Sequence, residues 1–166
     1  MARGELRRRD RELDTLETER LLVEARVGRV GTTDREGVPY VVPMNYVYDA
    51  ASRTIFLHCA ASGHLLDNLA FSSLACFEVD DPGEIIATGP DGCSTSQVYR
   101  SAICFGRARV VDGQQDREMA LRLFVRKYVD QGMPERRYDP TLNTLASTAV
   151  IAMQVERMTG KRRPAV

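Results

Sequence analysis

Two histidines close together in the chain could carry chemistry. His58 ends an apolar run that starts at Thr54, and His64 follows a turn of small residues, Ala61-Ser62-Gly63. A histidine has an ordinary pKa near ~6.5, so it can give or take a proton around neutral pH. The turn opens a predicted helix, and backbone N–H groups at a helix start can bind an anion such as a phosphate. The segment therefore predicts proton transfer beside an anion site.

Other site chemistries have less support from the same residues. Cys59 lies between the two histidines, but no fourth ligand follows at a spacing typical of zinc, so no metal site is predicted. The chain has no G-x-S-x-G motif and only two histidines, which disfavours a serine hydrolase. The four cysteines form no C-x-x-C pair. For His58 taken alone, a core histidine bonded to a backbone carbonyl is the simplest interpretation.

The composition is that of an ordinary globular protein. The 166 residues, 43% hydrophobic and 28% charged, are enough to bury one core. The 23 basic and 23 acidic residues cancel, which disfavours nucleic acid or an anionic membrane as partner. No apolar run reaches the length of a membrane span, and acidic residues follow the cluster Arg7-Arg8-Arg9. We expect a charged arm over residues 1–12, a single domain over residues 13–166, and a reduced, cytoplasmic protein.

Strands dominate the elements that must position these side chains. The predicted strands are Val27–Thr33, Val38–Tyr48, Thr54–Cys59, Leu74–Val79, Val98–Val111 and Ala149–Val155. Helices are predicted over Asp14–Arg26, Gly63–Phe71 and Gln114–Val129, the last of them for packing only. Strands joined by hairpins, with few helices, predict an antiparallel barrel without selecting the type of barrel.

Prolines and glycines mark the connections between the strands. Asp34–Gly37 is a hairpin turn signal. Pro39 and Pro43 indicate an edge, a bend or a bulge, because proline cannot donate to a strand ladder. Residues 80–97 are rich in glycine, proline and serine, and they predict a long loop.

Five motifs follow one another along most of the chain, roughly residues 29–161. They are Gly28-Arg29-Val30-Gly31-Thr32-Thr33, Pro39-Tyr40-Val41-Val42-Pro43-Met44-Asn45-Tyr46, the segment His58-x-Ala60-x-x-Gly63, the segment Tyr99-Arg100-Ser101-x-x-x-Phe105-Gly106, and Thr159-Gly160-Lys161. In this order they resemble the flavin-binding split-barrel proteins related to pyridoxamine 5'-phosphate oxidase. The resemblance is strongest to the 5-nitroimidazole antibiotic-resistance branch.

The resemblance implies a mainly β fold, the FMN-binding split barrel. This is an antiparallel, six-stranded, Greek-key-like barrel with peripheral helices, and it forms a homodimer with FMN at the interface. The implied catalytic residue is His58, facing the flavin and the substrate. The implied cofactor-binding residues are Pro43, Met44, Asn45, Tyr46, His58, Ser62, Gly63, His64, Leu65 and Ser101.

The phosphate position departs from the family pattern. Many relatives place a lysine or arginine shortly after the glycine, whereas this chain has Leu65 and Leu66. A lysine introduced at Leu65 is therefore expected to strengthen FMN binding. The groups left to hold the phosphate are Ser62, His64, Arg100 and Ser101.

The predicted function is FMN-dependent reduction of a small molecule, with a nitroaromatic as candidate substrate. One alternative is a non-catalytic flavin-binding module, such as a redox sensor or electron carrier. Another is a haem-handling split-barrel protein in which His58 or His64 ligates iron. A visible spectrum of the purified protein distinguishes flavin from haem.

Overall fold

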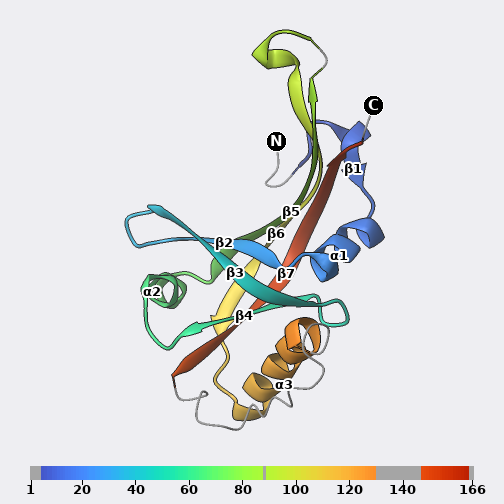
Figure 1. The fold of residues 1–166 in the computed structure, drawn as a ribbon. Helices are drawn as coiled ribbons and strands as arrows, with labels where there is room; N and C mark the ends of the chain where they lie inside the picture. The colour runs from blue at the N-terminus through green and yellow to red at the C-terminus, as the bar shows by residue number, and fades with distance from the viewer. Residues whose placement is uncertain (1–4, 88, 130–146, 165–166) are drawn as a thin grey trace.

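Six antiparallel strands close into a barrel (Figure 1). The computed structural model describes residues 5–87, 89–129 and 147–164 of the chain. The spatial order is β7-β4-β3-β2-β5-β6, and β6 pairs back with β7 to close the ring. The strands are β2 (Val27–Thr33), β3 (Pro39–Asp49), β4 (Thr54–Ala60), β5 (Leu74–Ala87), β6 (Thr95–Val110) and β7 (Thr148–Arg163). The predicted mainly β split barrel with peripheral helices is confirmed.

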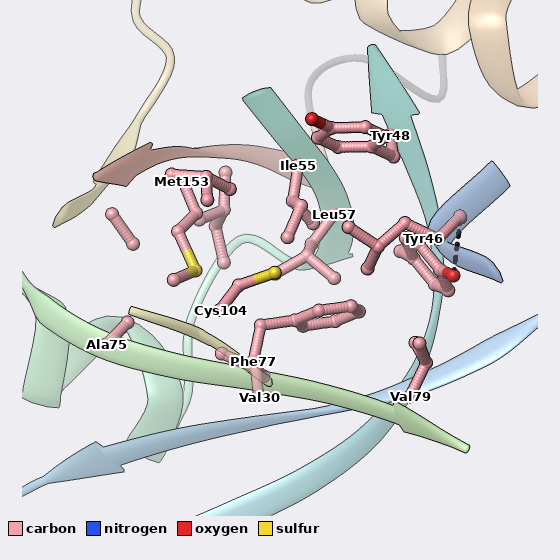
Figure 2. Close-up of a cluster of buried hydrophobic side chains, with 14 of the residues drawn as sticks. Val30, Tyr46, Tyr48, Ile55, Leu57, Ala75, Phe77, Val79, Cys104 and Met153 are labelled. Atoms are coloured by element: carbon pink, nitrogen blue, oxygen red, sulfur yellow. Dashed lines mark hydrogen bonds between the residues drawn. The ribbon is translucent and has the colours of Figure 1, made fainter. Parts of the chain in front are cut away.

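The core fills the barrel because alternate residues of each strand point inward. Figure 2 shows its centre, where the ring of Tyr46 packs edge-on against Phe77 with ring centroids 4.7 Å apart. Helix α1 (Thr15–Glu24) buries Leu21 and Leu22 in this core, and α2 (His64–Phe71) adds Leu65 and Leu69. The other buried members include Val30, Tyr48, Ile55, Leu57, Val79, Cys104 and Met153.

A second apolar cluster lies on the outside of the barrel. Helix α3 (Gln114–Phe124) packs there against Phe56 of β4 and Val150 of β7. One turn of π-helix, η3 (Val125–Val129), continues α3. The predicted helix Gln114–Val129 is therefore present, but its last five residues have π rather than α geometry.

Strand β3 changes its partner midway, and this opens the barrel on one side. Residues Pro39–Asn45 pair with β2, whereas Tyr46–Asp49 pair with β4. Beyond the last β3–β4 pair, Tyr46 with Leu57, the β4 residues 58–60 pair with β7 alone. The first half of β3 thus has a free edge toward β4. Of the edge, bend or bulge that the two prolines indicated, the structure has the edge.

The loop predicted over residues 80–97 is wrong. β5 continues to Ala87, β6 begins at Thr95, and the two form a hairpin that projects from the barrel (Figure 1). The short helix η2 (Gly92–Ser94) precedes β6. The register shifts between Pro82 and Ile85, so the proline and glycine mark a bulge within the ladder rather than a loop.

Both ends of the chain meet on β7. The short strand β1 (Glu12–Leu13), which follows the one-turn helix η1 (Arg9–Arg11), pairs with Lys161 and Gly160. The arm expected over residues 1–12 therefore already joins the sheet at Glu12. β7 runs to Arg163, well past the predicted end at Val155, so the Thr159–Lys161 motif lies inside a strand.

The helix α1 begins as predicted. The Asp14 side chain accepts from the Glu17 N–H at 2.7 Å, and the Glu17 side chain accepts from the Asp14 N–H, which completes the capping box. No helix among the described residues is long and apolar enough to cross a membrane.

The barrel closure depends on a glycine at position 106. A Cβ added there would overlap the carbonyl oxygen of Gln154, next to the bulge at Glu156 in β7. We expect Gly106→Ala to lower the free energy of unfolding by about 1–3 kcal/mol, because the backbone must move. Gly92→Ala is the control, since a Cβ there meets nothing within 4 Å. Denaturant unfolding measures both, and equal stabilities would contradict the packing at the bulge.

Candidate functional site

The opening between β3 and β4 has two defined ends. At one end is the last β3–β4 pair, Tyr46 with Leu57, so Asn45 and His58 are the first residues to diverge from it. At the other end, the ring of His64 stacks on Tyr40, with ring centroids 4.4 Å apart and 19° between the planes. We call the region bounded by residues 40–45 and 58–64 the split. It brings together most of the predicted site residues.

His58 lies on the outer face of β4, the same face as Phe56, and is partly exposed. The ring of Phe124 meets it edge-on, with centroids 4.7 Å apart and 74° between the planes. Burial lowers the pKa of His58 from its ordinary value, and it is the sole cause of the shift. This shift favours the neutral imidazole over the imidazolium form.

The β3 side of the split divides its residues between the two faces of the strand. Pro43 and Asn45 are exposed, and Met44 points inward and packs on the core. The Asn45 side-chain amide donates to the Arg26 carbonyl at 3.2 Å. Strand alternation thus leaves the Asn45 amide at the surface of the split, while Met44 contributes mainly to packing.

Tyr46 does not present its phenol to the split, which corrects the sequence prediction. Its side chain is fully buried, and its hydroxyl donates to the Leu22 carbonyl at 2.6 Å. Burial also raises its pKa. The reason is the register of β3, which directs this residue into the barrel centre beside Phe77.

The start of α2 offers free backbone donors. Gly63 precedes the helix with φ of 141°, a conformation that favours glycine, and a Cβ added there would meet nothing within 4 Å. No side chain caps this helix, and no hydrogen bond from the backbone N–H of His64 or Leu65 is found among the described residues. Ser62, just before Gly63, is exposed. This turn can accept an anion.

Leu65 faces the core rather than the turn, which corrects a second prediction. It is 7% exposed and belongs to the barrel cluster, whereas His64 is exposed. A lysine at Leu65 would therefore be buried and could not reach an anion at the start of α2 without disrupting the core.

Ser101 lies far from the split within one chain. It pairs with Asp80 on one side and Lys161 on the other, whereas His58 pairs with Val150. Lys161 lies eleven positions after Val150 on β7, which is about 36 Å along the strand at about 3.3 Å per residue. Within one chain, Ser101 therefore does not lie near the other predicted site residues.

An apolar groove on the outer face of the barrel was not anticipated from the sequence. It has a volume of about 580 Å³. Val41 and Leu74 in its lining are 61% and 45% exposed. Its other lining residues include Gly31, Cys76, Phe105 and Arg157. The alternation in β3 could have indicated this groove, because it places Val41 on the same outward face as Pro39 and Pro43.

Comparison with known proteins gives a consistent result. The model of the pyridoxamine 5'-phosphate oxidase family matches residues 14–162. Among solved structures, the chain is similar to a candidate 5-nitroimidazole antibiotic resistance protein from Bacteroides thetaiotaomicron. The two share 26% sequence identity with a TM-score of 0.76, over 91% of this chain and 86% of that one. A search of curated proteins returned no match.

Two further structures share the fold at lower identity. The FAD and heme binding protein from Mycobacterium smegmatis is 21% identical with a TM-score of 0.76, over 92% of this chain and 72% of that chain. The flavocytochrome Anf3 from Azotobacter vinelandii is also 21% identical with a TM-score of 0.76, over 92% and 68% of the two chains.

Lysine substitutions at positions 64 and 65 should distinguish a surface side chain from a core side chain at the start of α2. We expect Leu65→Lys to lower the free energy of unfolding by about 2–5 kcal/mol, because it removes a core side chain and buries an ammonium group. We expect His64→Lys to cost about 1 kcal/mol or less, the value of the lost stacking on Tyr40. Denaturant unfolding of the two variants checks this, and a stable Leu65→Lys protein would contradict the inward orientation of Leu65.

Proposed function

This chain belongs to the pyridoxamine 5'-phosphate oxidase family, and from that membership we propose that it is an FMN-dependent reductase of a small molecule. The observation that carries the proposal is the split. It combines two free strand edges, an uncapped helix start and a partly exposed histidine within one opening.

The split suits the ring of a flavin. Backbone N–H and C=O groups along a free strand edge have no strand partner, and they can bond the carbonyls and N–H of the flavin ring edge. The exposed amide of Asn45 adds a side-chain contact there, and Pro43 contributes an apolar surface. The Tyr46 phenol takes no part, because it is committed to Leu22.

The start of α2 suits the flavin phosphate. The backbone N–H groups of His64 and Leu65 provide donors, and Ser62 adds a hydroxyl. His64 follows the turn directly, and its ring stacks on Tyr40 at the far end of the split. This arrangement replaces the lysine or arginine that many relatives have after the glycine.

The chemistry divides between the cofactor and the protein. Bound flavin supplies the two-electron redox step between an electron donor and the substrate. His58 would supply a proton to the reduced substrate from its imidazolium form, which its lowered pKa disfavours. A nitroaromatic is our proposed substrate. The similarity to the Bacteroides thetaiotaomicron resistance protein supports this choice.

We further propose that two chains form an isologous dimer and that each site uses both. The apolar groove, with its exposed Val41 and Leu74, provides an unpartnered surface on the barrel. A two-fold axis can bring the Ser101 end of one barrel to the split of the other, which one chain cannot do alone. The dimer then contains two equivalent flavin sites.

The dimer should depend on the groove. We expect the native protein to sediment as a dimer at micromolar concentration and Val41→Arg to sediment as a monomer with weakened FMN binding, because an arginine would be buried against the partner. Val23→Arg is the matched control, since Val23 is 51% exposed on α1, outside the groove. A native protein that stays monomeric with and without FMN would count against the two-chain site.

Loss of the His58 imidazole should affect turnover more than flavin binding. We expect His58→Ala to retain FMN, seen as two broad absorption bands, while nitroaromatic reduction falls by about 10²–10⁴-fold. In the native protein, activity should decline as pH rises through the lowered pKa of His58, because the proton donor is then lost.

The controls for this variant separate three interpretations. Undiminished turnover in a flavin-loaded His58→Ala protein would remove His58 from the mechanism. A native protein that binds flavin but reduces no acceptor would favour the non-catalytic module. A single sharp Soret band in place of the flavin bands would favour a haem-handling protein.

A further inference from the structure

The end of α3 contacts both sides of the split through two aromatic residues. Phe124 is the last residue of α3, and Tyr128 follows four residues later in η3. Their rings stack with centroids 6.0 Å apart and 20° between the planes. One approaches β4, and the other approaches β3.

On the β4 side, Phe124 covers the ring of His58. It is 7% exposed, and it is the residue whose ring meets the imidazole, at 4.7 Å between centroids. The contact explains how a histidine at a free strand edge is partly desolvated. It also restricts the rotation of the imidazole, because the edge-on arrangement fixes one side of the ring.

On the β3 side, the Tyr128 hydroxyl bonds the backbone of β3 just before β2 begins at Val27. It accepts from the Tyr46 N–H at 3.1 Å and lies 2.7 Å from both the Tyr46 and Arg26 carbonyl oxygens, so it donates its single proton to one of them. The Arg26 carbonyl also accepts from the Asn45 amide. The Arg26 carbonyl therefore lies within hydrogen-bond distance of both Tyr128 and Asn45.

The neighbouring Lys127 anchors η3 to the same junction. Its ammonium donates to the Ala25 carbonyl at 2.7 Å, at the C-terminal end of α1, and lies 4.1 Å from the centroid of the Tyr46 ring. Burial lowers the pKa of Lys127 to about 8. The π-helical turn thus places two consecutive side chains on the α1–β2 junction, and π-turns of this kind are frequent at functional sites.

We propose that Phe124 and Tyr128 are positioning residues, Phe124 for the His58 imidazole and Tyr128 for the Asn45 amide on the opposite side of the split. That the His58 imidazole acts on the substrate and the Asn45 amide contacts the flavin rests on the proposed function. The positioning itself is a property of the chain without cofactor. A role in packing alone would not need the three backbone contacts of the Tyr128 hydroxyl.

The first test is NMR titration of the flavin-free protein. The chain has only two histidines, so the His58 and His64 signals are separable. Phe124→Leu should raise the pKa of His58 toward its ordinary value near ~6.5 and leave His64 unchanged. Leu121→Ala is the matched control, because Leu121 is equally buried in the same helix and cluster. An unchanged His58 pKa in Phe124→Leu, or an equal rise in Leu121→Ala, would overturn the proposal for Phe124.

The second test follows side-chain amides in the same flavin-free protein. Tyr128→Phe keeps the ring that stacks on Phe124 and removes only the hydroxyl. We expect the Asn45 amide signals to shift, while those of Asn68, which donates to Thr32 in a buried contact between α2 and β2, stay fixed. The His58 pKa should also stay fixed in this variant. Unmoved Asn45 signals would overturn the proposal for Tyr128.

Activity then separates the positioning proposal from the proposed function. In flavin-loaded Phe124→Leu, the pH at which nitroaromatic reduction declines should rise by the same amount as the His58 pKa. If the His58 pKa rises but the pH profile does not move, Phe124 positions His58 as proposed, and it is the catalytic role of His58 that fails.

Discussion

The structure depends on the change of partner within β3 between Asn45 and Tyr46. A strand that paired with β4 along its whole length would close the barrel, and no opening would remain. The two prolines occupy the half that pairs only with β2, where a missing N–H costs no ladder bond on the free side. This change of partner leaves the two strand edges free and places His58 just past the last β3–β4 pair. It also lets the chain leave β3 on its way from β4 to α2.

Much of the fold was readable from the sequence because alternation of apolar residues specifies a strand that faces one core. The alternation gave the strands around the barrel, and the capping pattern of Asp14 gave α1. It failed where a strand leaves the core. The outer half of the β5–β6 hairpin has no buried face, and the Pro82 bulge imitates a loop. The charged second half of β7 likewise gave no apolar signal, although β6 and β1 pair with it.

The candidate site was predictable as a segment and less so as individual side chains. The turn before α2 was located correctly because glycine and a helix start are local features. Tyr46 and Leu65 were misassigned because one step along a strand or helix reverses a side chain between core and surface, and only the register decides which. The role of Tyr128 could not be read at all, since its hydroxyl contacts Tyr46 from 82 residues away in the chain.

Subunit complementation tests whether each flavin site is shared between two chains. His64→Glu places a carboxylate where the phosphate would lie, and Ser101→Trp blocks the opposite end of the barrel, so each variant alone should bind no FMN. Random mixing of unfolded chains and refolding makes half of the dimers mixed, each with one intact site, so about a quarter of the native flavin should return. A mixture that binds no flavin, although mixed dimers form, would show that each site lies within one chain and would contradict the account.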